Sequence, residues 1–305
     1  MKKVIFDVDT GIDDAMAIAY AVNSPELELL GLTTSYGNVA VDEATRNTLA
    51  VLEKLGKRIP VYAGSAQPLA RSNREGFAKK VHGQDGLGNA LDFEPTASAE
   101  TQTAVDFIIN QVKELPNEVT IIAVGPLTNL ALALQKAPEI VDQVSDVVIM
   151  GGAVFVPGNV NPYAEANIFT DPEAAKIVLA SGLPIRLVGL DVTMQTLLPR
   201  EKVDAWRGSE VGDFFADMVG FYHDFYESAN PGIGGCGLHD PLAVGVAIDQ
   251  SFVKTKYIAV DVITEGEEDG RTVPAADGSP KIQVCTEVEA PKFLDHFLKR
   301  VPTAQ

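Results

Sequence analysis

Four aspartates lie within eight residues near the start of the chain, as Asp7, Asp9, Asp13 and Asp14. Carboxylates this close repel one another unless a cation lies between them. A hard, oxygen-binding ion such as Ca²⁺ suits this set, and the lack of a neighbouring His or Cys argues against zinc. The simpler alternative is that Asp13 and Asp14 cap a helix, while Asp7 and Asp9 are solvated turn residues.

Two known acidic motifs can be compared with this stretch. An EF-hand loop beginning at Asp7 needs Gly at its sixth position and Glu at its twelfth, where this chain has Ile12 and Ile18. Phosphatases of the haloacid-dehalogenase type carry a strand followed by Asp-x-Asp-x-Thr/Val. Asp7 and Asp9 match that pattern, but Gly11 takes the last place. The EF-hand is excluded, and the phosphatase stays open as an alternative.

The neighbouring elements indicate how the aspartates are held. A short apolar run leads into them and a helix-forming run follows, which predicts a strand, an acidic turn and a helix over residues 4–22. Strands are then expected at 27–34, 59–64, 119–124, 144–150 and 184–190, alternating with helices. The alternation predicts an α/β, Rossmann-like fold with a mostly parallel central sheet and helices on both faces. Because ligands bind at the carboxyl ends of such strands, Asp7 and Asp9 favour a binding site.

Three segments rich in glycine or amides interrupt the alternation, at residues 65–95, 157–171 and 229–237. Long loops in compact domains are often functional. Taken alone, the amides are more simply turn formers, and a His-Asp pair before a helix is more simply a cap. The residues in or directly after these segments that could reach a ligand are His82, Asn159, Glu165, Asn167, His239 and Asp240.

The C-terminal third has a different pattern. Residues 200–228 are expected to be helical, with Tyr222 and Tyr226 one turn apart on the same face, a spacing more often seen in packing than in ligand binding. Residues 257–264 and 281–288 alternate apolar and polar side chains, which predicts a small antiparallel addition. No repeat or low-complexity linker interrupts the chain, so we expect a single domain over 1–305.

Composition limits the possible partners. The chain has 305 residues and a formal net charge of −18, which argues against nucleic acid or an anionic membrane and favours a small ligand or metal ion. No stretch is long and apolar enough to span a membrane, and Asp7 interrupts the first apolar run too early for a signal peptide. Cys236 and Cys285 are far apart, so we expect reduced thiols and a cytoplasmic protein.

Taken together, these motifs resemble those of the nucleoside hydrolases, the inosine–uridine-preferring N-ribohydrolase family. The stretch Asp7–Ala15 is similar to the family signature, except that Thr10 stands where the usual form has Pro. No side-chain chemistry is assigned to that position. The similarity continues in the expected order through residues 37–38, 82–83, 125–129, 150–152, 165–167, 189–193 and 239–241.

The resemblance implies a single α/β domain with one bound Ca²⁺, a nucleoside substrate and a homo-oligomer, either a dimer or a tetramer. Carried over by position, the metal ligands would be the carboxylates of Asp9, Asp14 and Asp240 and the main-chain carbonyl of Val124. Asp13, Asn159, Glu165 and Asn167 would bind the ribose hydroxyls, with Asn38 and Met150 nearby. Asp7 would lie behind the ligands.

Hydrolysis of an N-glycosidic bond passes through an oxocarbenium-like ribosyl cation. Asp9 is the candidate base for the attacking water. His239 is the favoured donor to the leaving base, with His82 contacting the base and Tyr222 and Tyr226 lining its pocket. Trp206 lies in a polar helix, which disfavours a purine-specific branch that stacks on Trp. Base preference is not indicated, and a non-catalytic nucleoside- or ribose-binding protein is the third alternative.

Overall fold

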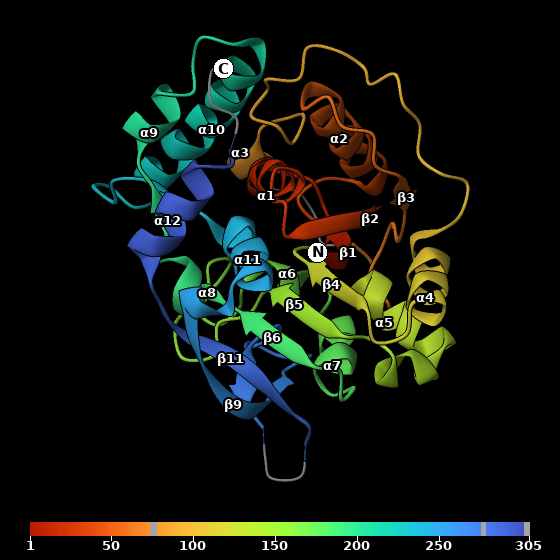
Figure 1. Cartoon of the computed structure of the whole chain (residues 1–305). Coiled ribbons are helices and arrows are strands. Elements are labelled where there is room, and N and C mark those ends of the chain that lie inside the picture. Colours follow the sequence, from red (N-terminus) through yellow and green to blue (C-terminus); the bar gives the residue numbers. More distant parts are fainter. Residues whose placement is uncertain (74–77, 276–278, 302–305) are drawn as a thin grey trace.

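The computed structural model describes residues 1–73, 78–275 and 279–301, and a single large sheet runs through its centre (Figure 1). Within these residues, the strands of this sheet lie in the order β10–β9–β11–β6–β5–β4–β1–β2–β3. They are β1 Lys2–Val8, β2 Leu27–Thr34, β3 Val61–Ala63, β4 Val119–Ala123, β5 Asp146–Met150, β6 Ile185–Val188, β9 Val253–Val262, β10 Thr272–Pro274 and β11 Lys281–Val288. All neighbours from β3 to β11 pair in parallel, whereas β9 pairs antiparallel with β11 and with β10.

Both the parallel sheet and its antiparallel C-terminal addition were predicted, and both are confirmed. The successive residues of β1 explain why the sheet is covered twice. Val4, Phe6 and Val8 pack with α1, α10 and α11, whereas Ile5 packs on the opposite face with α4, α5 and α7. Such alternation, with both sets apolar, is typical of a strand buried on both sides.

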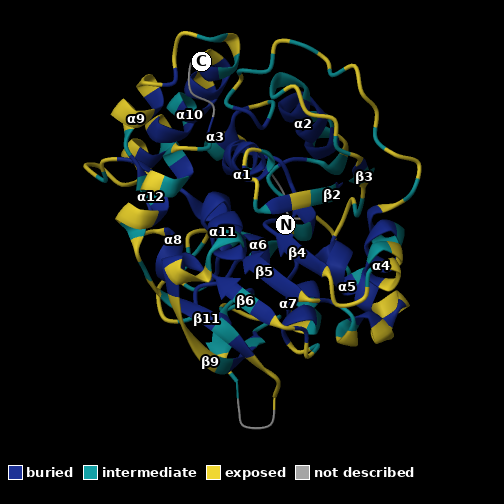
Figure 2. Cartoon of the chain, in the orientation of Figure 1, coloured by how far each residue is buried: buried dark blue, intermediate teal, exposed yellow. Residues whose placement is uncertain are grey.

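Helices cover both faces of the sheet, and the buried residues concentrate between the layers (Figure 2). The helices are α1 Ile12–Val22, α2 Val41–Lys54, α3 Lys79–His82, α4 Ala104–Glu114, α5 Thr128–Lys136, α6 Ala166–Thr170, α7 Pro172–Leu179, α8 Leu190–Thr193, α9 Arg200–Asp204, α10 Glu210–Ala229, α11 His239–Ile248 and α12 Ala290–Leu298. Short 3₁₀ turns follow α5 and α11. Among the described helices, none is both long and apolar enough to cross a bilayer.

Several expected boundaries were wrong, for identifiable reasons. The helix expected over 200–228 is broken between α9 and α10, because Gly208 has a φ of +112° and the Ser209 hydroxyl then caps α10 by accepting from the Gly212 amide. The strand expected to reach residue 190 ends at Val188, because Gly189 is already the N-cap of α8. Strand β9 begins earlier than expected, at Val253, and a further strand, β10, lies between the two segments expected to form the antiparallel addition.

Four parallel strands end side by side at one edge of the sheet, since β1 and β6 are separated in space only by β4 and β5. The residues that follow these strand ends are Asp9, Val124, Gly151 and Gly189. A separate two-stranded ribbon, β7 Leu197–Leu198 and β8 Cys236–Gly237, connects the segment after α8 with the start of α11. These connections bring distant parts of the chain to one edge of the sheet.

Candidate functional site

The turn between β1 and α1 is fixed by hydrogen bonds to Asp14. Its carboxylate accepts from the main-chain amides of Asp9 at 3.1 Å and Gly11 at 2.9 Å, and from the side-chain amide of Asn38 at 3.2 Å. Asp14 is the third residue of α1, where a carboxylate that reaches back to the cap satisfies free amides and complements the helix dipole. The helix-capping interpretation therefore describes part of its role.

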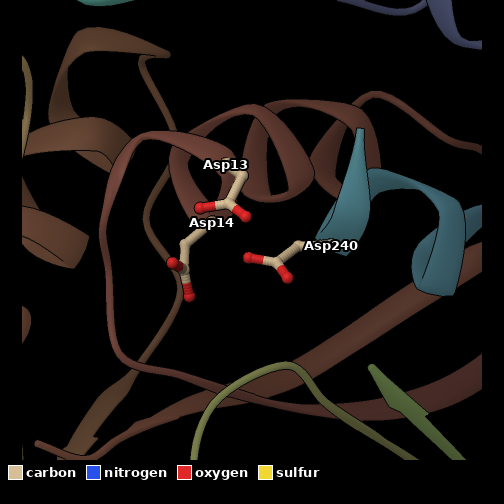
Figure 3. A group of neighbouring side chains, drawn as sticks. All are labelled: Asp13, Asp14 and Asp240. Carbon is tan, nitrogen blue, oxygen red and sulfur yellow. The ribbon is translucent and has the colours of Figure 1, made fainter. Parts of the chain in front are cut away.

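Three carboxylates from two helices converge beside this turn. Asp13 and Asp14 come from the first turn of α1, and Asp240 comes from the first turn of α11. One oxygen of each lies within 4.8 Å of the others, and all three residues are buried. Figure 3 shows the Asp240 side chain extending from α11 toward Asp13 and Asp14 at the start of α1. The positive ends of two helix dipoles thus face the cluster.

Asp9 is held next to Asp14 in a space that only glycines leave open. A Cβ atom on Gly37 would overlap Asp9 Oδ2, and a Cβ atom on Gly125 would lie 2.9 Å from Oδ1. Oδ2 accepts a 2.6 Å hydrogen bond from the main-chain amide of Asn38. Oδ1 is buried and, among the described residues, has no hydrogen-bond partner; the same is true of Asp13 Oδ1.

Burial dominates the electrostatics of these acids. It raises the pKa of Asp13 to about 8, and it raises the pKa values of Asp9 and Asp240 well above the usual range. Repulsion from neighbouring carboxylates adds to the effect. Two unpartnered buried oxygens within an all-carboxylate donor set fit a hard divalent cation that takes oxygen ligands.

A cavity of about 680 Å³ opens above the cluster. Among the described residues, every predicted site residue except Asp9 and Asp14 lines this cavity. Asp9 and Asp14 both accept hydrogen bonds from Asn38, which does line it. The predicted residues in its wall are Asp13, Asn38, His82, Val124, Met150, Asn159, Glu165, Asn167, Tyr222, Tyr226, His239 and Asp240. The cavity wall therefore brings together predicted residues that lie between positions 13 and 240 of the chain.

The polar wall next to the acids is preorganised by main-chain groups. The Asn167 side-chain amide donates to the Val124 carbonyl at 2.7 Å and to the Met150 carbonyl at 3.2 Å. The Glu165 carboxylate accepts from the amides of Gly152, Asn167 and Ile168, at 2.9, 3.0 and 3.2 Å. Glu165 thus caps α6 while facing the cavity, so the turn-forming and ligand-facing interpretations both apply to it.

Both cavity histidines are buried in defined orientations. His82 Nδ1 accepts from the Ile12 amide at 3.0 Å, which leaves the proton on Nε2, and its ring stacks on Tyr222 with centroids 5.6 Å apart. His239 Nε2 lies 2.5 Å from the Tyr226 hydroxyl, and its Nδ1 lies 2.8 Å from the Thr193 hydroxyl. Burial lowers the pKa of His82 to about 3 and that of His239 to about 4. Both rings are neutral at pH 7.

Comparison with known proteins gives the family. A family model described as "Inosine-uridine preferring nucleoside hydrolase" matches residues 4–295. The chain belongs to this family. It is therefore a nucleoside hydrolase, and its fold and enzyme class follow from the match.

Relatives of the nucleoside hydrolase cover nearly the whole chain. "Probable uridine nucleosidase 1" of Oryza sativa subsp. japonica is 40% identical over 274 residues, covering 89% of this chain and 84% of the relative. "Pyrimidine-specific ribonucleoside hydrolase RihB" of Escherichia coli (strain SE11) is 39% identical over 277 residues, covering 89% and 87%. A solved structure, "Purine-Preferring Ribonucleoside Hydrolase from Gardnerella vaginalis", has a TM-score of 0.95 at 44% identity and covers 98% of each chain.

The family match over residues 4–295 excludes the phosphatase alternative. Asp7, the nucleophile which that alternative needed, is buried and does not line the described cavity wall. Its Oδ1 accepts from the Thr33 hydroxyl and from the Asn129 amide. Asp7 is thus a buried support below the turn. Trp206 does not line the described wall. The polar helix expected around it was wrong, because Trp206 is buried in the turn between α9 and α10.

Some wall residues of this nucleoside hydrolase were missed. Asp191 accepts from the amides of Val154 and Phe155, at 3.0 and 2.8 Å, and so fixes the loop after β5 at the cavity mouth. Its position just after a predicted strand was the available signal. Loop and helix side chains carried no such signal, and the remaining unpredicted members of the wall include Val156, Val160, Met194, Gln195, Phe225 and Asn230.

Proposed function

We propose that this nucleoside hydrolase cleaves the N-glycosidic bond of ribonucleosides to ribose and free base, with Ca²⁺ as its metal ion. The observation that carries the proposal is the buried carboxylate cluster beside a cavity whose wall also carries aromatic and apolar side chains. The ion would be held by Asp9, Asp14 and Asp240 and by the Val124 carbonyl. When bound, it would orient and polarise a water molecule and the ribose hydroxyls.

The residues around the acids suit both base catalysis and charge stabilisation. Asp9 would accept a proton from the attacking water, since its Oδ1 is buried and has no described hydrogen-bond partner. The water oxygen forms a bond to C1′, and the pair of the breaking C1′–N bond leaves with the base. Asp13 and its neighbouring carboxylates would stabilise the positive charge that develops on the sugar.

The sugar would be oriented by the preorganised polar wall. Asp13 offers an unpartnered carboxylate oxygen to a ribose hydroxyl, and Asn38 lies on the same side of the cavity. Asn159, Glu165 and Asn167 lie on the segment that closes over the ends of β4 and β5, next to Met150. Contacts with the sugar, away from the leaving base, supply binding energy that positions C1′ against the water.

Departure of the base requires a proton on its nitrogen. The Tyr226 hydroxyl, His239 and the Thr193 hydroxyl form a continuous hydrogen-bonded chain at the cavity wall, and a neutral relay of this kind can deliver a proton. His82 would present its Nε2 proton to the base, while Tyr222 stacks behind it. His239 is therefore the proposed proton donor, acting together with Tyr226.

The experiment is a ribose-release assay across uridine, cytidine, inosine, adenosine and guanosine, because the relatives' names give both purine and pyrimidine preferences. We expect turnover of at least one nucleoside, its loss in Asp9→Asn, and its loss on chelation with recovery on added Ca²⁺. No release of ribose from any of the five nucleosides would contradict the proposal. Tight nucleoside binding without turnover would favour the non-catalytic alternative.

We also propose that the protein is a cytoplasmic homo-oligomer, a dimer or a tetramer, whose chain folds as one domain. Light scattering of the purified protein tests the oligomer, and cell fractionation tests the location. A single calorimetric unfolding transition is expected of one domain. A monomer by light scattering, or two separate transitions, would contradict these statements.

A further inference from the structure

His223 lies on helix α10 beside the two tyrosines of the cavity but does not itself line the described wall. It is 4% exposed, and its Nε2 lies 2.7 Å from the main-chain carbonyl of Leu198. Because a carbonyl can only accept, the Nε2 proton of His223 is donated to it. A buried donor on α10 is therefore joined to strand β7.

Strand β7 also positions the residue that begins α11. Leu198 pairs with Cys236 in β8, and the Leu238 amide donates to the Thr196 carbonyl at 2.9 Å. The next residue after Leu238 is His239, the first of α11. The strand that accepts the His223 bond thus holds the chain directly before His239.

A second connection closes this arrangement into a ring. His239 contacts the Tyr226 hydroxyl through Nε2 and the Thr193 hydroxyl through Nδ1. Thr193 lies just before β7, and its carbonyl accepts from the Thr196 hydroxyl at 2.9 Å. Tyr226 follows His223 by about one helical turn. Helix α10 is therefore joined to residues 193–198 twice, once through His239 and once through His223.

We propose that His223 is a positioning residue that sets the register of α10, so that the Tyr226 hydroxyl meets His239 and the leaving base is protonated. The inference rests on the proposed function, in which Tyr226 and His239 assist departure of the base. Losing the His223 bond removes one of the two connections between α10 and residues 193–198 and frees α10 to shift. A shift of about 1 Å in a catalytic group can cost roughly a hundredfold in rate.

The test compares two variants on two kinds of substrate. His223→Leu removes the donor at similar volume, and His223→Gln keeps a donor of similar reach. Uridine or inosine needs a proton on its leaving base, whereas 4-nitrophenyl riboside releases a stable phenolate without one. We expect His223→Leu to lower kcat on nucleosides roughly tenfold to a hundredfold with little change in KM. Hydrolysis of the nitrophenyl riboside should be nearly unchanged, and His223→Gln should recover most of the lost rate.

A double-mutant cycle gives an independent readout. In a Tyr226→Phe background, His223→Leu should have little further effect, because the group it positions is already missing. Equal losses on both substrate types, or losses that multiply with Tyr226→Phe, would overturn the inference. If His223→Leu does not fold, His223→Gln is compared with His223→Asn, whose side chain is too short to reach the Leu198 carbonyl. Equal nucleoside turnover by these two variants would overturn the inference as well. A wild-type protein inactive on both substrates would instead refute the proposed function, and this inference with it.

Discussion

The side-chain amide of Asn167 donates a 2.7 Å hydrogen bond to the main-chain carbonyl of Val124. A carbonyl oxygen has two lone pairs, so Val124 can accept from Asn167 and still face a metal ion. Asn167 also donates to Met150, so one amide ties the ends of two neighbouring strands to the cavity wall. This bond connects the proposed sugar contacts with the proposed metal ligands.

We expect Asn167→Leu to weaken Ca²⁺ binding about tenfold to a hundredfold, as loss of a residue that orients a ligand usually does. KM for nucleosides should rise as well, because a sugar contact is lost. Calorimetric titration of the metal and steady-state kinetics measure the two effects. Asn110→Leu, at an exposed position of α4, serves as the control. Unchanged metal affinity in Asn167→Leu would contradict the proposed coupling.

Gly37→Ala should remove activity by displacing the Asp9 carboxylate. The added Cβ atom overlaps Oδ2, and Gly125 leaves the side chain no room on the other side. We expect at least about a hundredfold loss of kcat, the scale of a misplaced catalytic base. Gly220→Ala is the matched control, because a Cβ atom there meets no described atom within 4 Å and should stabilise α10 slightly. Full activity of Gly37→Ala would exclude Asp9 as the base.

The metal-free protein should lose stability as the pH rises from about 4 to 8. Burial raises the folded-state pKa of Asp13 to about 8, and those of Asp9, Asp14 and Asp240 also lie above their unfolded values. In this pH range the folded chain binds more protons than the unfolded chain, so the free energy of unfolding falls with increasing pH. Thermal denaturation after chelation measures it, and added Ca²⁺ should flatten the dependence.

A control separates this effect from the general negative charge of the chain. Asp13→Asn should reduce the slope in the metal-free protein, whereas Asp92→Asn, at an exposed loop position, should leave it unchanged. Equal slopes in the two variants would show that the cluster is not responsible. A melting temperature that rises with pH after chelation would have the opposite sign to the prediction.

Asp191→Asn should raise KM more than it lowers kcat. The aspartate accepts from the main-chain amides of Val154 and Phe155. In an asparagine, the side-chain NH₂ group would face one of these amides, so that two donors would meet without an acceptor. Losing one such bond costs roughly 1.4 kcal/mol, which is about tenfold in KM if the loop after β5 contacts the substrate. Asp146→Asn breaks an ion pair with Arg186 at the other end of the sheet, so it should lower the melting temperature without changing KM.

Local patterns in the sequence predicted most of the fold. The strand, turn and helix around Asp9 follow from an apolar run that ends at an acid, and the sheet follows from repeated alternation. The break at Gly208 was missed because helix-forming residues lie on both sides and a single glycine decides it. The approach of Asp240 to Asp14 depends on the packing of α11 against α1, which no local pattern contains; it was expected only from the family resemblance.

The wall contributed by α10 was the least predictable part of the cavity. Tyr222 and Tyr226 were singled out because they share a helix face, but Phe225 and Asn230 also reach the cavity. Which side chains of α10 face inward depends on how the helix is rotated, and that rotation is fixed by distant bonds such as the one between His223 and Leu198. The spacing of apolar residues along a helix predicts which face is buried. It does not show whether that face packs in the core or lines a cavity.

The acids and the aromatic wall of the cavity come from different parts of the molecule. The acids Asp13, Asp14 and Asp240 stand on α1 and α11, whereas Tyr222, Phe225 and Tyr226 come from α10. Substitutions on α10 can therefore alter the aromatic wall while the acids are kept. Relatives of similar identity carry names with opposite base preferences. For protein engineering, a library confined to Tyr222 and Phe225 of α10 would vary the aromatic wall while the acids, His239 and its partner Tyr226 are kept.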